Sequence, residues 1–197
     1  MNILTSRLQL RPFTEQDLSD VFEYCNQAGV GEIAGWPAHN SILQTKKILS
    51  EWILQKRKLA IVWYENGKVL GHISIDEDSE EGREDTRELG CALNRAYQRR
   101  GIMSEAIIAI LDYLFNHGIS YIWACCFQEN LASKGMIEKC GFIFQQEGTY
   151  HSKELNKIYC SFEYRLSKKE WMEQKNKIRK SRTTKINTKK LPTISIS

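Results

Sequence analysis

The sequence predicts an α+β fold, with a mixed, mostly antiparallel sheet of six to seven strands flanked by helices on both faces. Segments with strand and helix patterns follow one another in the order βααβββαβαββ. Such an order pairs neighbouring strands antiparallel and leaves one strand–helix–strand crossover in the middle. Because 42% of the 197 residues are apolar and only three are proline, the chain can bury a core of this size.

The first third of the chain predicts one strand and two helices. Apolar and polar residues alternate over residues 8–13, which is typical of a strand. Thr14 and Asp17 then form a capping box ahead of a helix. A glycine-rich loop over residues 28–41 leads into a second helix over residues 43–56.

The middle of the chain changes to strand periodicity. Residues 59–64 and 69–75 flank the turn signal Asn66-Gly67 and predict a hairpin. Residues 76–88 hold eight acids and two arginines, so we expect an acidic excursion before a strand over residues 88–93. This excursion either attracts a cationic partner or is a solvated loop.

The second half of the chain contains the strongest helix pattern. Apolar residues repeat at three-to-four spacing over residues 101–116, and Gly118 lies near the expected end. The remaining predicted elements are a strand over residues 121–127, a helix over 131–139, and two strands over 142–147 and 158–166 around a turn with Gly148.

Charge divides the chain into two parts. Residues 168–197 contain ten Lys and Arg residues against two acids, which leaves residues 1–167 with a net charge of −4. We therefore expect a folded domain over residues 1–167 and a basic C-terminal tail over 168–197. The tail is expected to be flexible from Lys175, since apolar residues are sparse there.

Composition also excludes several classes of protein. No apolar run approaches the roughly 20 residues that span a bilayer, and no secretory signal opens the chain, so we expect a cytoplasmic protein without a membrane segment. Six cysteines form no CxxC pair and four histidines are scattered, which predicts neither a disulfide framework nor a metal site.

One candidate site lies where the strand over residues 88–93 leads to the helix that begins near Gly101. A helix start presents unpaired N–H groups and the positive end of the helix dipole, and Gly101 lets a ligand approach the backbone. These features are typical of a diphosphate cradle, and the alternative is a basic surface turn. The segment reads Gln98, Arg99, Arg100, Gly101, Ile102, Met103 and Ser104.

A second motif follows about thirty residues later. Asn130 is placed to cap the helix over residues 131–139 and to offer its amide to a ligand, and Ser133 faces the same side one turn on. The full pattern is N-x-x-S-x-x-x-x-E-K-x-G-F, formed by Asn130, Ser133, Glu138, Lys139, Gly141 and Phe142.

These two motifs in this order resemble those of the GNAT acyltransferase superfamily, in particular the branch with the ribosomal-protein-alanine N-acetyltransferases. The opening T-S-R-L-Q-L-R-P of residues 5–12 and the Gly35-Trp36-Pro37 loop are similar to that branch as well. The resemblance covers residues 3–166 and implies a GNAT-like fold and an acetyl-CoA-dependent transfer to an amine.

The resemblance also implies where acetyl-CoA binds. The pantetheine arm would pair with the strand end, the diphosphate would sit on the Gln98 to Met103 loop, and the nucleotide would lie beside the helix that starts at Asn130. Met103 departs from the Gly or Ala of the family. The implied binding residues are Cys91, Ala92, Leu93, Gln98, Arg99, Arg100, Gly101, Ile102, Met103, Ser104, Asn130 and Ser133.

Catalysis in such a site is direct attack of a neutral amine on the thioester in a ternary complex, with backbone N–H groups stabilising the oxyanion. Many members carry a tyrosine acid where this chain has Ile137, so Ser133 is our candidate acid, as in the ribosomal branch; otherwise it is an ordinary helix-face serine. Glu88 is the first candidate base and Glu154 the second, and either could instead be merely solvated. Trp36 either lines the acceptor pocket or packs over the core.

Two classes of function follow. The first is an N-acetyltransferase that acts on a protein N-terminus, such as that of a ribosomal protein, or on a small amine. The second is a catalytically silent GNAT-fold module that binds a CoA ester or docks on RNA through its basic tail. Apart from that tail we expect no nucleic-acid contact, and a homodimer is left open.

Overall fold

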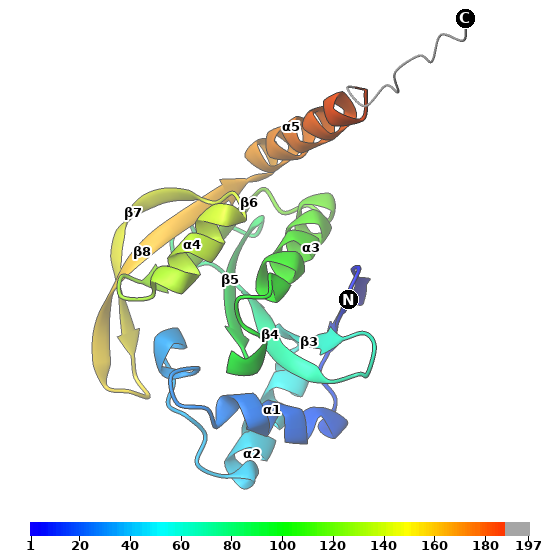
Figure 1. The fold of residues 1–197 in the computed structure, drawn as a ribbon. Coiled ribbons are helices and arrows are strands. Elements are labelled where there is room, and N and C mark those ends of the chain that lie inside the picture. The colour runs from blue at the N-terminus through cyan, green and yellow to red at the C-terminus, as the bar shows by residue number, and fades with distance from the viewer. Residues whose placement is uncertain (188–197) are drawn as a thin grey trace, which may run out of the picture.

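The computed structural model describes residues 1–187 as an eight-stranded sheet with five α-helices (Figure 1). The helices are α1 (Leu18–Cys25), α2 (Ile42–Gln55), α3 (Ile102–Asn116), α4 (Leu131–Lys139) and α5 (Lys168–Asn187). The strands are β1 (Ile3–Leu4), β2 (Leu8–Pro12), β3 (Lys58–Trp63), β4 (Val69–Asp76), β5 (Thr86–Leu93), β6 (Tyr121–Phe127), β7 (Ile143–Ser152) and β8 (Lys157–Ser167).

The sheet has the predicted mixed topology, in the order β1-β2-β3-β4-β5-β6-β8-β7. Its parallel pair is β5 with β6, which α3 connects, and the other described pairs are antiparallel. The sheet has eight strands rather than six to seven because β1 was missed. Two residues are too few to show a period-two pattern, and β1 is recognised only by its pairing with β2.

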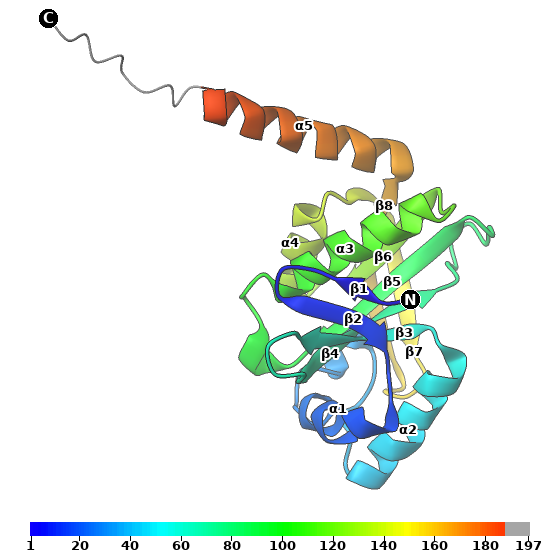
Figure 2. The same ribbon diagram turned by 90° about the vertical axis from the view of Figure 1, so that its right-hand side faces the viewer.

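Helices cover both faces of the sheet, as predicted (Figures 1 and 2). One core cluster joins Leu89 of β5 to α3 and α4. The other joins Ala92 of the same strand to α1 and α2. Because side chains alternate along a strand, Glu88, Gly90 and Ala92 face α1 and α2, whereas Leu89, Cys91 and Leu93 face α3 and α4.

The last hairpin corrects one prediction. Strand β7 runs through Gly148 to Ser152, and the turn occupies residues 153–156, with Asn156 at φ +46°. Gly148 lies opposite Ser161, and a Cβ there would stand 2.7 Å from Oε1 of Glu163. This glycine therefore makes room for a cross-strand side chain instead of forming a turn.

In the C-terminal segment, residues 168–187 form the helix α5, which includes residues 175–187 of the predicted tail. Ser167 and Glu170 form a capping box at its start, and the buried Trp171 donates a hydrogen bond of 2.8 Å to Asp112. The packed body therefore extends past residue 167. The part of the tail prediction that concerns residues 188–197 falls outside the described residues.

Within residues 1–187, none of the helices combines the length and apolar character needed to cross a bilayer.

Candidate active site

The sheet opens between β5 and β6. The two strands pair only over residues 86–89 of β5 and 121–124 of β6. Beyond that point β5 continues with β4 alone, and β6 continues with β8 alone. A parallel pair that separates halfway leaves backbone groups of both strands without a sheet partner.

The alternation of backbone groups shows which atoms of β5 face the opening. The N–H of Asn94 donates to the carbonyl of Leu70 in β4, at 2.8 Å. Neighbouring residues of a strand direct their N–H groups to opposite edges, so those of Leu93 and Cys91 point toward β6. The predicted pantetheine strand, residues 91–93, is thus a free strand edge.

The side chain of Gln98 holds this strand end in place. Its Nε2 donates to the carbonyl of Leu93 at 3.0 Å. Asn94 is buried, and its Oδ1 accepts from the N–H of Ala96, which caps the short turn before Gln98. The side-chain amide of Gln98, a predicted binding residue, is therefore bonded to the protein's own backbone.

The predicted diphosphate loop has an unusual backbone. Arg99 has φ +60° and Gly101 has φ +73°, so two residues in the left-handed region flank Arg100. The left-handed conformation costs a non-glycine residue roughly 1 kcal/mol or more. Left-handed residues of this kind are found in anion-binding nests, where successive N–H groups point to one concave side.

The loop runs directly into the N-terminus of α3. The first backbone bond of this helix is from Glu105 to the carbonyl of Gly101, at 3.0 Å, so the N–H groups of residues 102–104 precede it without a helical acceptor. The side chain of Met103 packs against the α3 and α4 core cluster. Met103 therefore leaves its N–H group accessible despite departing from the family pattern.

The second motif folds as predicted at the start of α4. Oδ1 of Asn130 accepts the N–H of Ser133 at 3.0 Å, which leaves Nδ2 of Asn130 available. Ser133 is half-buried, and its hydroxyl makes no hydrogen bond to another described residue. Ile137, at the position of the family tyrosine, is buried in the core.

The face of the sheet toward α1 and α2 is acidic at the opening. Glu88 is paired across the sheet with Asp76 of β4 and with Trp123 of β6, and Cys125 of β6 is paired with Glu163 of β8. Burial raises the pKa of Glu88, and the carboxylates of Glu163 and Asp76 raise it further. Like charges directly opposite each other destabilise a sheet, so this cluster lowers the stability of the protein and is not needed for its fold.

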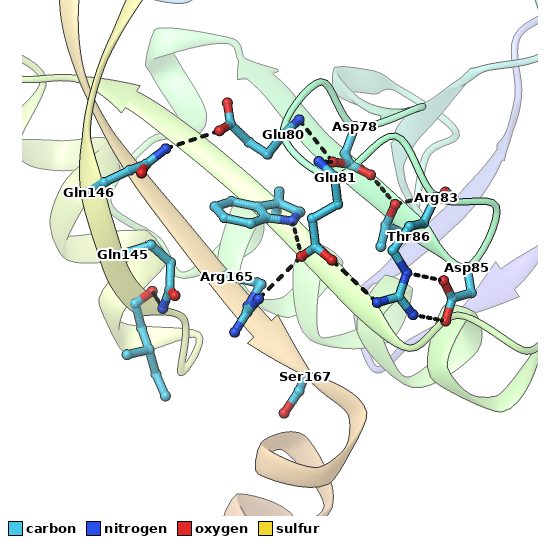
Figure 3. Close-up of polar contacts among 12 residues, drawn as sticks. Asp78, Glu80, Glu81, Arg83, Asp85, Thr86, Gln145, Gln146, Arg165 and Ser167 are labelled. Atoms are coloured by element: carbon cyan, nitrogen blue, oxygen red, sulfur yellow. Dashed lines mark hydrogen bonds and ion pairs between the residues drawn. The ribbon is translucent and has the colours of Figure 1, made fainter.

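The excursion between β4 and β5 forms a rim that is held by hydrogen bonds, although most of its residues are exposed to solvent (Figure 3). The carboxylate of Asp78 accepts the N–H groups of Glu80 and Glu81 at 3.0 and 2.6 Å and the hydroxyl of Thr86. Oε1 of Glu81 accepts from Trp123 at 3.1 Å and from Arg165 at 3.2 Å. These bonds fix the rim above β6 and β8.

Glu80 extends this rim toward the last strand. Its carboxylate accepts from Nε2 of Gln146 on β7, at 3.0 Å, so the rim reaches across the sheet from β5 to β7 (Figure 3). The negative charge of Glu80 also contributes to the raised pKa of Glu163, whose largest cause is burial. The carboxylates of the excursion therefore act electrostatically on those of the strands.

Tyr150 of β7 lies beside Gly35 on the same face of the sheet as these acids, and sequence reasoning missed it. A Cβ on Gly35 would stand 2.5 Å from Cε1 of Tyr150, and the hydroxyl of Ser152 donates to the carbonyl of Gly35 at 2.7 Å. Burial raises the pKa of Tyr150, with further contributions from Cys125, Glu154 and Glu88. Only the register of the β7–β8 hairpin brings this tyrosine to the site.

Two other candidates take simpler places. Trp36 is half-buried against the α1 and α2 core cluster, with its ring centroid 5.5 Å from that of His39, which fits the core-packing alternative. Glu154 lies exposed in the β7–β8 turn, whereas Glu88 lies half-buried on the sheet. The geometry therefore favours Glu88 over Glu154 as a base.

The cysteines near the opening are not activated nucleophiles. Burial raises the pKa of Cys91 to about 12 and that of Cys126 to about 11. Burial and the neighbouring Glu88 and Glu163 also raise the pKa of Cys125. A thiol with a raised pKa carries little thiolate, so these cysteines are poor candidates for a nucleophile. Across residues 1–187, no group of three or more His, Cys, Asp or Glu side chains is arranged to hold a metal ion.

A strand edge freed by a splayed parallel pair lies beside a loop with two left-handed residues and a helix N-terminus, which is the arrangement that the resemblance to acyltransferases implies. The model of the acetyltransferase (GNAT) domain matches residues 7–143, and the chain belongs to this family. This confirms the resemblance to the GNAT superfamily, the acyltransferase class and the fold.

Individual relatives agree with this assignment. The chain is 28% identical over 180 residues to the uncharacterized N-acetyltransferase YnaD of Bacillus subtilis, covering 87% of this chain and 99% of YnaD. A GNAT-family acetyltransferase from Bacillus anthracis superposes with a TM-score of 0.77 at 23% identity, over 86% of this chain and 99% of that one. The ribosomal-protein-S5-alanine acetyltransferase from Vibrio fischeri gives 0.68 at 18% identity, over 87% and 98%. At these identities, the two structures show the shared fold.

Proposed function

We propose that this protein transfers the acetyl group of acetyl-CoA to a cationic primary amine by direct attack in a ternary complex. The observation that carries the proposal is the free edge of β5 beside the unpaired N–H groups at the start of α3. A ligand with an extended amide chain attached to a diphosphate would pair with the strand edge and with the helix N–H groups together. Acetyl-CoA has this form.

On the donor side, the protein acts mainly through its backbone. The N–H groups of Cys91 and Leu93 would pair with the acetylated pantetheine arm, as an added strand does. The N–H groups of Ile102, Met103 and Ser104, with the charge of Arg99 and Arg100, would bind the diphosphate. The remaining predicted contacts, those of the helix start at Asn130, would border the nucleotide.

On the acceptor side, side chains would handle the protons. Glu88 would take a proton from the ammonium through water, so that the amine attacks as a neutral nucleophile. The N–H groups at the end of β5 would stabilise the oxyanion as the new C–N bond forms. As the C–S bond then breaks, Ser133 would donate a proton to the departing thiolate. A thiol pKa of about 8.5 makes this thiolate a tolerable leaving group, so a weak acid suffices.

The choice of acceptor is proposed from charge. Glu88, Glu163, Asp76 and Glu80 place carboxylates around the entrance, which favours an amine that arrives protonated. Both a protein N-terminus and a small amine fit this description. The activity in the name of the Vibrio fischeri neighbour supports the first, and the carboxylates of the rim over β6 and β8 support the second, because they match a small polycation such as a polyamine.

The test is CoA release from acetyl-CoA with a panel of amines: a polyamine, an aminoglycoside, and peptides that begin with alanine or serine. The proposal expects release that requires an amine and increases with its concentration. Analogues of the active amine in which every amino group is acetylated are neutral and should not support release. Saturable acetyl-CoA binding without release for any amine would instead identify a silent CoA-ester-binding module.

A further inference from the structure

We infer that Arg7 is a positioning residue for the diphosphate loop and sets the direction of its N–H groups. The inference rests on the proposed function, since it assumes that the loop over residues 98–103 binds a diphosphate. Arg7 belongs to the T-S-R-L-Q-L-R-P segment at the start of the chain, far from the loop in sequence. The proposed donor and acceptor chemistry does not use this segment.

The first contact joins Arg7 to the loop itself. Nη1 of Arg7 donates to the carbonyl of Arg100 at 3.2 Å. The carbonyl and N–H of a trans peptide point in opposite directions, so a held Arg100 carbonyl orients the N–H of Gly101 away from Arg7. Arg7 thereby fixes the peptide that joins Arg100 to the left-handed Gly101, directly before the helix.

The second contact joins Arg7 to the first turn of α3. Nε of Arg7 donates to Oε2 of Glu105 at 2.7 Å. Oε1 of Glu105 accepts from the hydroxyls of Thr5 and Ser6, at 2.6 and 3.0 Å, and from the N–H of Arg7 at 3.1 Å. One carboxylate therefore ties the β1–β2 turn to the helix that presents the N–H groups.

Charge makes Arg7 more than a structural tie. A Cβ on Gly101 would lie 3.8 Å from Nη2 of Arg7, so the guanidinium stands against the left-handed glycine. Its side chain is 38% exposed, which leaves the group open to solvent beside the loop. A cation at this place orients the backbone and also adds to the field that favours a diphosphate.

Arg11 provides a matched control from the same segment. It forms a two-point pair with Asp17, at 2.8 and 2.7 Å, but this pair belongs to the capping box before α1. Arg7→Met and Arg11→Met thus each remove an arginine–carboxylate pair, and only the first removes a contact to the diphosphate loop.

The experiment compares two ligands on the full-length protein, CoA and pantetheine, which lacks the diphosphate and nucleotide. Dissociation constants would be measured by calorimetric titration, with competition at millimolar concentration for the weaker ligand. Arg7→Met should weaken CoA about tenfold and leave pantetheine within twofold. Arg7→Lys should recover part of the loss because it restores the charge. Arg11→Met should leave both constants within twofold.

The possible failures are distinguishable. Equal loss for both ligands in Arg7→Met, or loss for neither, overturns the role of Arg7 while leaving the diphosphate loop in place. If the wild-type protein binds pantetheine as tightly as CoA, the loop does not bind the diphosphate, and the proposed function and this inference both fail. Unfolding midpoints of both variants show whether a loss reflects folding.

Discussion

The two sides of the open sheet are built in different ways. On the α3 and α4 side, the proposed donor site consists of backbone N–H groups, a left-handed loop and two helix starts, with the Gln98 amide and Oδ1 of Asn130 bonded to the protein's own backbone. On the α1 and α2 side, the proposed acceptor site consists of side chains from four strands and a rim. A donor site made of backbone groups can keep one ligand while the sequence varies. An acceptor site made of side chains can change its acceptor when those side chains are substituted.

The largest effect is expected on the acceptor side. Glu88→Gln keeps the size of the side chain but removes the base, so kcat for CoA release at pH 7 should fall about 100-fold or more. Acetyl-CoA binding should be unchanged, since the donor side is backbone. Glu154→Gln is the control and should alter kcat less than twofold. A normal rate in Glu88→Gln with a collapsed rate in Glu154→Gln would reverse the assignment of the base.

A smaller effect is expected for Ser133. Because a thiolate leaves without strong acid assistance, Ser133→Ala should lower kcat about tenfold with little change in the KM for acetyl-CoA. Ser133→Thr retains a hydroxyl and should recover most of the rate. If alanine and threonine variants are equally active, the serine hydroxyl has no role, and Ser133 is a helix-face residue.

The smallest effect is a displacement of the pH profile. The pKa of Glu88 is raised, chiefly by burial and also by Glu163, and the base must be deprotonated, so kcat/KM falls as pH drops through this raised pKa. Glu163→Gln removes a like charge, lowers the pKa of Glu88 and should move the acidic limb to lower pH. Glu147→Gln, an exposed residue opposite Phe162 on the other face, should not move it. If the acidic limb does not move in Glu163→Gln, the charge of Glu163 does not influence the pKa of Glu88.

The same contrast explains what the sequence could predict. The donor motifs are local: Gly101 begins a helix and Asn130 caps one within a few residues, so spacing alone located them. The acceptor face depends on register between strands that are far apart in sequence, and a shift of one residue in β7 or β8 would turn Tyr150 or Glu163 to the opposite side. The turn predicted at Gly148 would have produced such an error.

Arg7 and the C-terminal helix show the same limit. The segment containing Arg7 was noticed as a family resemblance, but its contact with Arg100 joins residues 93 positions apart. The capping box of Ser167 and Glu170 was present in the sequence as S-x-x-E and was overlooked because the basic composition suggested a tail. Here a local signal was available, and composition outweighed it.

The central claim is that the backbone at Gly101 and α3 binds acetyl-CoA. The most direct test is the thermal unfolding midpoint with and without acetyl-CoA, for wild type, Gly101→Asp and Gly118→Asp. Gly118 also has a positive φ, of +93°, and a Cβ there would meet no atom within 4 Å, so this variant matches the backbone strain away from the site. Ligand at about 100-fold over its dissociation constant should stabilise wild type by about 2.7 kcal/mol, which is roughly 5 to 10 °C at this size.

The account predicts this shift in wild type and Gly118→Asp and its loss in Gly101→Asp, where a carboxylate would repel the diphosphate. An equal shift in all three proteins would contradict it, because acetyl-CoA would then bind elsewhere. The absence of a shift in wild type would contradict the account as well.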